Sequence, residues 1–331
     1  MFKFFFDGAH EDIICAENLL EAWKEFVRGK KNKKDVQEFS INLMDNIFSL
    51  HYDLTNLTYR HGGYQAFNIS DPKPRNIHKA IVRDRLLHHA IHRKLYPFFD
   101  RTFIADSYSC RLNKGTHKAI NRFKKFAHRA SKNNTQTCWI LKCDIRKFFA
   151  NIDHKVLLKI VQEYVPDEKI NRLLGEVMAS FYSTRAGVGL PLGNLTSQLF
   201  VNIYMNKFDR FAKHSLKAKY YIRYADDFVI FSKNKKWLEN SIEPISDFLR
   251  NELKLELHPD KVYIKTLASG VDFLGWTHFS DHRVLRTTTK RRMFKKIKAS
   301  PVFAALNSYL GLLSHGNAYK MTQELKEVFH S

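Results

Sequence analysis

Two adjacent aspartates, Asp226 and Asp227, lie between two short apolar segments. Residues 220–224 read Tyr-Tyr-Ile-Arg-Tyr, and residues 228–231 read Phe-Val-Ile-Phe. Aromatic and β-branched residues at this density favour strands, so the segment predicts a β-hairpin with the two carboxylates at its tip. A purely structural turn more often combines Asp with Gly or Asn, which supply the backbone angles. Adjacent carboxylates repel each other, and a hard divalent cation relieves that repulsion. Taken alone, the tetrapeptide can also be a polar turn.

A third acid ends another apolar segment. Residues 139–145 read Trp-Ile-Leu-Lys-Cys-Asp-Ile, which predicts a buried strand with Asp144 at its C-terminal end. Two-metal phosphoryl transfer needs carboxylates from separate backbone elements, which hold two ions about 3.5–4 Å apart. A strand-end or helix-capping acid explains Asp144 equally well by itself. Together with Asp226 and Asp227, Asp144 predicts a two-metal site.

The charge of the chain points to a polyanionic partner. The 331 residues include 55 Lys and Arg against 33 Asp and Glu, a formal net charge of +22. Nucleic acid is the leading candidate for such a basic protein. A solvated basic surface and an acidic membrane surface are the alternatives, although no amphipathic terminal anchor is evident. The hydrophobic content of 44% suffices for a sizeable core.

Cysteine usage predicts a reducing compartment. Cys15, Cys110, Cys138 and Cys143 form neither a CxxC pair nor a finger-like Cys/His pattern, so zinc is not expected. The sequence shows no secretory signal and no membrane span. We therefore expect a cytoplasmic protein that does not associate with membranes.

Longer segments around the three acids resemble a known family. Residues 142–154 and Tyr224-Ala225-Asp226-Asp227 resemble the two catalytic blocks of reverse transcriptases of the group II intron lineage. Further blocks follow in the order of that family. They are residues 75–85 and 107–115 for the fingers, 190–198 with 202–204 for the nucleotide pocket, 255–261 for the lysine block and 273–276 for the primer grip. Seven blocks in one order make the resemblance specific.

The resemblance implies a right-hand polymerase fold with fingers, palm and a short helical thumb. Alternating strands and helices without a parallel βαβ run also favour an α+β fold. We expect N-terminal helices and fingers in residues 1–135, the palm with part of the fingers in 136–286, and the helical thumb in 287–331. Apolar spacing predicts helices at 11–28, 36–50, 84–99, 118–130, 152–164, 194–211 and 237–253, and two thumb helices separated by Gly316-Asn317.

The resemblance also implies a metal site. Asp144, Asp226 and Asp227, with the carbonyl of Ile145, would bind two Mg²⁺ ions, for which Mn²⁺ can substitute. Lys261 occupies the lysine-block position and would protonate the leaving pyrophosphate. The competing interpretation of Lys261 is a solvated lysine after a Pro-Asp turn.

Several residues are expected at the incoming nucleotide. By resemblance, Phe149 would stack beneath the sugar and exclude a 2′-hydroxyl, which favours dNTP over NTP. Its alternative is an ordinary core aromatic, for which Phe148 is the better candidate. Gly193 allows close backbone approach, and Leu192 replaces the usual Gln and cannot hydrogen-bond to the nucleotide. The cations expected at the triphosphate are Arg75, Lys79, Arg83 and Arg111, each of which can also be a basic surface residue.

The C-terminal part of the chain is expected to hold the primer and the duplex. Phe273, Leu274, Gly275 and Trp276 would form a hairpin under the primer strand, although a plain buried hairpin explains them as well. The cations expected to follow the duplex backbone are Lys290, Arg291, Arg292, Lys295 and Lys296, through contacts that weaken with salt. A-form geometry and 2′-hydroxyls would let the channel accept an RNA template.

Two details resemble one branch of the lineage, the reverse transcriptases of diversity-generating retroelements. These are Leu192-Gly193 with Ser197-Gln198, and the stretch 107–117. The branch implies cDNA synthesis from a structured template RNA with errors at template adenines. It implies as partners the RNA, the RNA/cDNA duplex, dNTPs and a small basic accessory protein that can be oligomeric. The alternatives are another bacterial reverse transcriptase (group II intron-like, retron or phage-defence) or a non-catalytic RNA-binding protein. Retention of all three acids disfavours the last.

Overall fold

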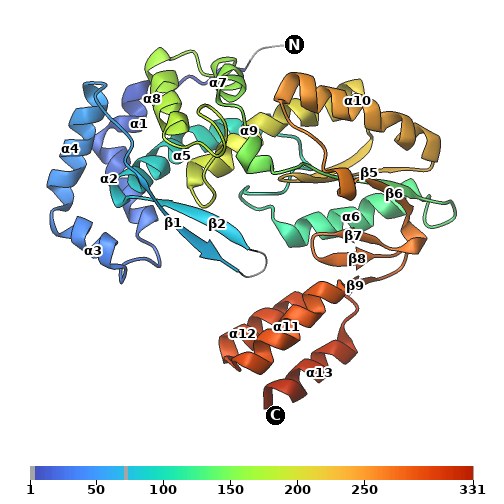
Figure 1. Cartoon of the computed structure of the whole chain (residues 1–331). Coiled ribbons are helices and arrows are strands. Elements are labelled where there is room, and N and C mark those ends of the chain that lie inside the picture. The colour runs from blue at the N-terminus through green and yellow to red at the C-terminus, as the bar shows by residue number, and fades with distance from the viewer. Residues whose placement is uncertain (1–3, 71–73, 331) are drawn as a thin grey trace. The chain divides into compact units, whose positions relative to one another are not determined.

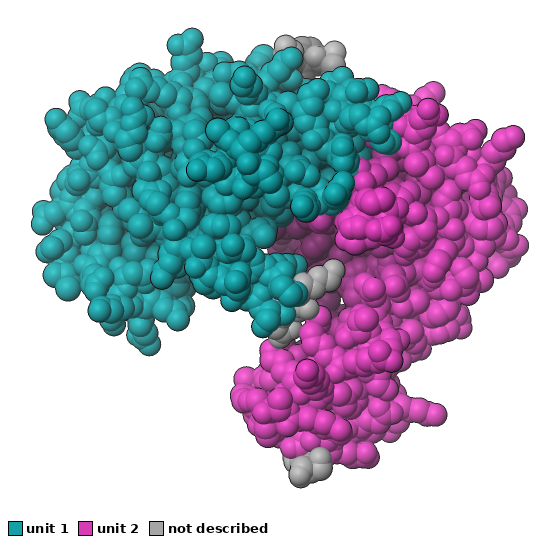
Figure 2. Space-filling model, in the orientation of Figure 1, with its two compact units in different colours: residues 1–105, 145–211, 246–256 teal, residues 106–144, 212–245, 257–331 magenta. Residues whose placement is uncertain are grey.

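The computed structural model describes residues 4–70 and 74–330 (Figure 1). The chain divides into two compact units, each assembled from separate segments (Figure 2). Unit 1 comprises Met1–Ala105, Ile145–Phe211 and Ser246–Glu256, and unit 2 comprises Asp106–Asp144, Ala212–Ile245 and Leu257–Ser331. In the described residues, no helix is long and apolar enough to cross a membrane. The expected subdomain boundaries near residues 135 and 286 stay predictions.

Unit 1 is mainly helical. It contains α1 (His10–Ile14), α2 (Ala16–Phe26), α3 (Lys34–Ile41), α4 (Leu43–Thr55), α5 (Val82–Thr102), α7 (His154–Gln162), α8 (Glu168–Ala179) and α9 (Leu195–Arg210). The antiparallel hairpin of β1 (Tyr64–Ile69) and β2 (Arg75–Ala80) belongs to it as well. Leu87, Ile91 and Leu95 of α5 are fully buried at a spacing of four residues, so α5 presents an apolar face to α2 and α9.

The helix expected over residues 11–28 is broken. Cys15 is extended, with ψ of 148°, and separates α1 from α2. The Asn18 side chain donates to the Ile13 carbonyl at 2.7 Å and so satisfies one backbone group left open by the break. Its amide also reaches the Ala90 carbonyl of α5 at 3.2 Å. The break therefore lets two short helices pack on α5, which periodicity alone did not predict.

The helix expected over residues 36–50 is likewise divided, at Asn42 between α3 and α4. The Asn46 side chain donates to the Phe39 carbonyl at 3.0 Å, again beside the break. Helix α8 was not among the helices expected from the sequence. Asp167 caps that helix by accepting from the Ile170 amide at 3.0 Å, after Pro166, so a start signal was present.

Unit 2 is built on a four-stranded antiparallel sheet. Its strands are β3 (Trp139–Asp144), β4 (Tyr220–Tyr224), β5 (Asp227–Ser232) and β6 (Tyr263–Thr266), in the order β4-β5-β3-β6. Helix α6 (Thr116–Ala130) packs on it through Phe123 and Phe126, which share a core with Ile222, Val229 and Phe231. Helix α10 (Lys235–Leu253) contains residues of both units. The mixture of helices and antiparallel strands is that of the expected α+β class.

A second, smaller sheet carries the C-terminal helices. It consists of β7 (Val271–Phe273), β8 (Trp276–His278) and β9 (Arg283–Leu285), followed by α11 (Thr287–Ala299), α12 (Phe303–Leu313) and α13 (Tyr319–His330). Trp276, Leu285, Met293, Ile297 and Leu306 form one buried cluster that joins the sheet to the helices. The two helices predicted on either side of Gly316-Asn317 are confirmed as α12 and α13.

Candidate active site

The predicted acidic hairpin is present in unit 2. Strands β4 and β5 pair with Tyr224 opposite Asp227, so Ala225 and Asp226 form a two-residue turn. Ala225 has a φ of +56°, a left-handed conformation that a residue with a side chain rarely adopts. The backbone at the tip is therefore strained locally and must be held by surrounding contacts.

A buried arginine that was not among the predicted site residues provides such contacts. Arg223 is fully buried, and its guanidinium donates to the Ala225 carbonyl at 3.1 Å and to Ser107 Oγ at 3.0 Å. Its backbone amide donates to the Asp106 carbonyl, and its carbonyl accepts from the Tyr108 amide. A lone arginine within an apolar strand was the available signal, because a buried charge requires partners.

Strand β3 brings Asp144 to the acidic hairpin. Asp144 pairs directly with Asp227 across β3 and β5, so both side chains project from the same face of the sheet. Asp226 and Asp144 also interact electrostatically. The structure thus gathers the three sequence-predicted acids at one end of the sheet, from two separate backbone elements.

Two lysines neutralise part of this charge. Lys142 Nζ lies 2.6 Å from Asp227 Oδ1, and Lys261 Nζ lies 3.0 Å from Asp144 Oδ1. Lys142 is buried and stands two residues before Asp144, on the same face of β3, a pattern that the sequence analysis did not use. Lys261 is about half exposed and lies beside the end of β3, where the His258 amide donates to the Asp144 carbonyl. Asp226 forms no ion pair within the described residues.

Burial dominates the protonation of the hairpin acids. It raises the pKa of Asp227 to about 6, although the adjacent Lys142 acts in the opposite direction. Burial also raises the pKa of Asp226, and the negative charge of Asp144 adds to the shift. Carboxylates that resist ionisation here would ionise readily beside a cation.

The donor set suits a hard divalent cation. No group of three or more His, Cys, Asp or Glu side chains in residues 4–70 and 74–330 already has metal-binding geometry. Oxygens of Asp227 and Asp144 instead contact the ammonium groups of Lys142 and Lys261. Oxygen ligands from separate strands fit Mg²⁺ chemistry, and burial raises the pKa of Asp226 and of Asp227. Asp144, Asp226 and Asp227 would hold such ions; the part expected of the Ile145 carbonyl stays a prediction.

The residues expected around the nucleotide base and sugar lie in unit 1. Two hydrogen bonds join the loop that contains Leu192 and Gly193 to β2. The His78 amide donates to the Leu192 carbonyl at 3.2 Å, and the His78 carbonyl accepts from the Asn194 side chain at 3.0 Å. Gly193 has a φ of +102°, and a Cβ there would lie 2.9 Å from Ile77. Glycine suits this position, because the positive φ and the close approach to Ile77 both disfavour a side chain. The expected close approach of the Gly193 backbone to a nucleotide stays a prediction.

Phe148 and Phe149 differ as expected for a core residue and its neighbour. Phe148 is buried at 3% exposure, whereas Phe149 is only partly buried, and their rings meet edge to face at 5.5 Å. Both lie in the 3₁₀ turn Phe148–Asn151, and the Phe149 carbonyl accepts from the Leu190 amide. Phe148 is therefore the core aromatic, and the sugar-sensing role of Phe149 stays a prediction.

The four cations expected at the triphosphate have different surroundings. Arg75 is exposed at the start of β2. Lys79 forms an ion pair with Asp35 at 2.6 Å, and Arg83 forms one with Asp53 at 2.5 Å. These pairs link the β2–α5 segment to α3 and α4, a structural use that the sequence motif did not reveal.

Arg111, the fourth of these cations, belongs to unit 2. It lies on the loop before α6 and donates to the Ser107 carbonyl at 3.1 Å. Phosphate-binding roles for Arg75, Lys79, Arg83 and Arg111 stay predictions.

The primer-grip hairpin is also present, but most of its apolar side chains are internal. Phe273 and Trp276 are buried at 1% and 0% exposure. Leu274 and Gly275 form the turn, with φ of +51° and +87°, the left-handed angles of a two-residue hairpin turn. Primer contacts by side chains of this hairpin are therefore best sought at the partly exposed turn, and that role stays a prediction.

The expected duplex-binding cations lie on α11. Arg291, Lys295 and Lys296 are exposed, and Arg292 is half-buried. Lys290 pairs with Glu324 of α13 at 3.1 Å, so part of its charge is used within the helical bundle. The placement of these cations is compatible with a basic surface, and their contact with a duplex stays a prediction.

Comparison with known proteins gives the class of this chain. The family described as reverse transcriptase (RNA-dependent DNA polymerase) matches residues 70–278. This range contains all three acids and more than half of the chain, so the chain belongs to that family. Its enzyme class is RNA-directed DNA polymerase, and the family implies the right-hand polymerase fold.

Individual relatives agree with this assignment. Protein YkfC of Escherichia coli K12 is 26% identical over 276 residues, covering 72% of this chain and 70% of YkfC. The group II intron-encoded protein LtrA of Lactococcus lactis is 24% identical over 282 residues, covering 64% of this chain. A putative COX1/OXI3 intron 2 protein of Saccharomyces cerevisiae is 21% identical over 328 residues. The alignments span only 45% of LtrA and 36% of the yeast protein.

Proposed function

We propose that this protein copies an RNA template into cDNA by two-metal nucleotidyl transfer. The observation that carries the proposal is the placement of Asp144 opposite Asp227, with Asp226 in the adjoining turn. In this reaction the primer 3′-hydroxyl attacks the α-phosphorus of a dNTP and pyrophosphate leaves. Bound Mg²⁺, or Mn²⁺ in its place, would lower the pKa of the attacking hydroxyl and neutralise the developing phosphate charge.

The side chains of the site have separate tasks in this proposal. Asp144, Asp226 and Asp227 bind the ions and hold them against the sheet. Lys261 is half exposed beside Asp144 and protonates the leaving pyrophosphate, acting as a general acid. Lys142 offsets the charge of Asp227 and keeps its carboxylate in one orientation.

Primer extension on poly(rA)/oligo(dT) with Mg²⁺ tests the proposal. We expect the wild-type protein to extend the primer with dTTP, and Asp144→Ala to abolish extension while binding the same duplex. A wild-type protein that binds RNA but never extends a primer would instead be a non-catalytic RNA-binding protein.

Within this activity, we propose the branch of diversity-generating retroelements. Leu192-Gly193, Ser197-Gln198 and the stretch 107–117 support it. The protein would then copy a structured template RNA in the cytoplasm, with errors at template adenines, together with a small basic accessory protein. Sequencing of the cDNA is the direct test, because uniformly accurate copying would contradict this branch.

A group II intron-like reverse transcriptase is the second candidate, and the alignment with LtrA favours it. The two candidates differ in what surrounds the gene. A neighbouring pair of near-identical repeats that differ at adenines would support the retroelement, and flanking intron RNA structure would support the intron-like enzyme.

A further inference from the structure

Helix α6 presents a basic face that the polymerase chemistry does not use. Its 15 residues include no Asp or Glu. Its outward residues are His117, Lys118, Asn121, Lys124, Lys125, His128 and Arg129, all exposed. Lys124, Lys125 and Arg129 form no ion pair among the described residues, unlike Arg122, which pairs with Asp106. Unpaired cations on one face of a helix form an electrostatic surface for a polyanion.

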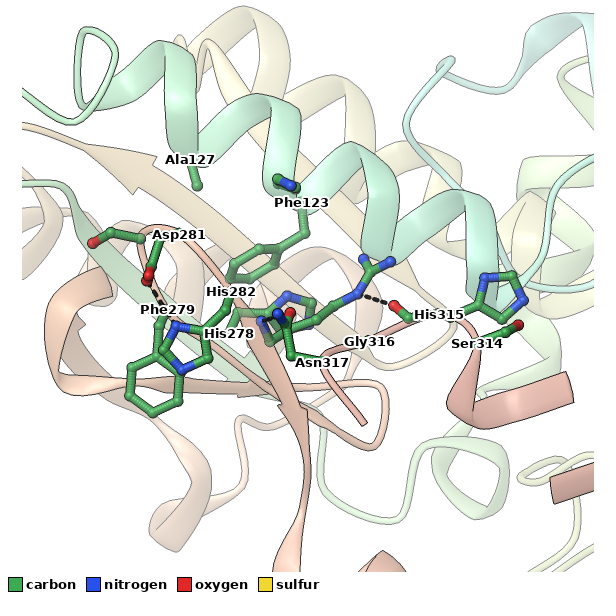
Figure 3. A pocket seen from close by; sticks show the side chains of 13 residues that line it. Phe123, Ala127, His278, Phe279, Asp281, His282, Ser314, His315, Gly316 and Asn317 are labelled. Atoms are coloured by element: carbon green, nitrogen blue, oxygen red, sulfur yellow. Dashed lines mark hydrogen bonds and ion pairs between the residues drawn. The ribbon is translucent and has the colours of Figure 1, made fainter. Parts of the chain in front are cut away.

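Three hollows lie beside α6 and the loop that follows it. A pocket of about 230 Å³ is lined by Lys124, His278, Ser280, Asp281 and residues 314–317 (Figure 3). A hollow of about 570 Å³ shares Lys124, Ser280 and Asp281 with it and adds Lys125 and His128. A further hollow of about 370 Å³ continues from Ser280 to the loop at residues 131–138. We call these three hollows, which share Ser280 in their linings, the α6 groove.

The wall opposite α6 carries an aromatic platform. Phe279 and His282 stack with ring centroids 4.7 Å apart and planes 12° from parallel, in the turn between β8 and β9 (Figure 3). The Phe279 amide donates to the His282 carbonyl at 2.9 Å, which fixes the turn. Both side chains are partly exposed. The acid of this wall, Asp281, is paired with His282 at 2.7 Å, so its charge is partly compensated when the imidazole is protonated.

These features match one kind of ligand. Proteins hold single-stranded nucleic acid by combining a basic groove along the backbone with aromatic rings on which bases stack. We propose that the α6 groove binds a single-stranded segment of the template RNA, with phosphates at Lys124 and Lys125 and a base on the Phe279–His282 platform. Neither the three acids nor the turn of the primer-grip hairpin lines the groove.

The consequence is a second point of attachment for the RNA. A long template held both at the site of copying and at the α6 groove would bind more tightly than a short duplex, because the second contact is intramolecular. The inference rests on the proposed function for the identity of the nucleic acid as RNA. The groove itself follows from charge, shape and aromatic exposure.

The test compares RNA binding with primer extension for Lys124→Gln/Lys125→Gln. Binding is measured by fluorescence anisotropy with a long, unstructured single-stranded RNA, across a salt series. Each lost phosphate contact lowers the salt slope by about 0.7, so we expect a slope smaller by about 1.4 and an affinity about tenfold weaker at moderate salt. Extension of a short primer–template duplex, fully paired except at the template nucleotide being copied, should stay within about twofold of wild type, because that duplex offers the groove no single-stranded segment.

Matched variants separate this effect from general loss of charge. Lys233→Gln/Lys236→Gln removes two exposed lysines of the same unit that do not line the groove, and should leave RNA affinity near wild type. Phe279→Leu should weaken RNA binding about fivefold or more, because base stacking is lost.

Each outcome has a defined meaning. Unchanged RNA affinity and salt slope in Lys124→Gln/Lys125→Gln would overturn the proposal and leave this face to a protein partner. Equal loss of RNA affinity in Lys124→Gln/Lys125→Gln and Lys233→Gln/Lys236→Gln would also overturn the proposal, because affinity would then depend only on the total charge of the protein. A wild-type protein that binds the RNA through the groove but does not extend a primer would refute the proposed function alone.

Discussion

The acidic hairpin at residues 220–232 and the primer-grip hairpin at 271–278 share a turn length but differ in what holds them. Both turns have two residues, and both place a residue with a side chain, Ala225 or Leu274, at positive φ. Polar contacts hold the first turn, from the buried Arg223 guanidinium and from Lys142. Apolar packing of Phe273 and Trp276 holds the second.

The difference indicates that the acidic hairpin serves the proposed reaction and that the primer-grip hairpin stabilises the fold. The carboxylates at the acidic hairpin are partly buried and lie close to one another. Their ionised forms are therefore unfavourable, and a bound cation would stabilise them. The primer-grip hairpin gains stability from burial and joins the small sheet to the C-terminal helices. Changes in the first hairpin should therefore alter activity, whereas changes in the second should alter stability.

The largest effect is expected for Asp226→Ala. Loss of a ligand removes several kcal/mol of transition-state stabilisation, so primer extension should fall by about a thousandfold or more. Because burial raises the pKa of Asp226, its ionised carboxylate is unfavourable in the metal-free fold, and the melting temperature should not fall. Extension and thermal unfolding are measured in parallel, with Glu243→Ala, an exposed acid of α10, as control. A variant whose extension stays within about tenfold of wild type would refute the assignment of Asp226.

The two hairpins should contribute opposite pH dependences to the unfolding free energy. His278 is 2% exposed, stacks on Phe123 at 4.1 Å, and burial lowers its pKa to about 4. Between pH 4 and 6.5 the folded state binds fewer protons at this site than the unfolded chain, so the unfolding free energy rises with pH. Relative to pH below 4, the shifted pKa of His278 adds about 3 kcal/mol to the unfolding free energy above pH 6.5. This contribution is lost as the pH falls from 6.5 through 4.

Asp227 changes the unfolding free energy with pH in the opposite direction. Its pKa is raised to about 6, so the folded state binds more protons there and stability falls as the pH rises from about 4 to 6. We expect His278→Gln to reduce the gain in unfolding free energy between pH 4 and 6.5 relative to wild type, as measured by urea unfolding at each pH. If wild type and variant show parallel curves, His278 is not the group responsible.

Gly316→Ala tests apolar support of the primer-grip hairpin. A Cβ at Gly316 would lie 2.0 Å from the Trp276 ring, which is fully buried. Such overpacking costs about 1–3 kcal/mol of unfolding free energy, with single-nucleotide addition little changed.

The control for this change is Gly311→Ala in α12, where a Cβ would meet nothing within 4 Å. That variant should be as stable as wild type or up to about 1 kcal/mol more stable, because alanine favours the helix. Unfolding in urea measures both variants, and equal stability of the two would contradict close packing between Gly316 and Trp276.

The smallest effect is expected at Leu192, in a loop that hydrogen bonds from the His78 amide and the Asn194 side chain join to β2. Leu192→Gln can add one hydrogen bond to a correctly paired nucleotide, worth about 0.5–1.5 kcal/mol, or roughly two- to twelvefold in discrimination. We expect fewer misincorporations, with the largest gain opposite template adenine. Sequencing cDNA made on one template by both enzymes measures this, and identical error spectra would assign Leu192 to packing alone.

Local sequence determined the elements whose signals lie within a few residues. The acidic hairpin, the buried strand ending at Asp144 and most helices follow from apolar spacing, which acts over one or two turns. The breaks at Cys15 and Asn42 did not follow, because their energies depend on the asparagine side chains that satisfy nearby carbonyl groups and on helices that pack from elsewhere.

The candidate site divides in the same way. Its residue types and order in the chain identified the three acids, which the pairing of β3 with β5 then brought together. Tertiary structure alone decided the contacts of Lys142 and Arg223, the pairing of Lys79 with Asp35, and the burial of Trp276. A motif records which groups the chemistry needs, whereas ion pairs and burial depend on segments far apart in the chain that meet only when it folds.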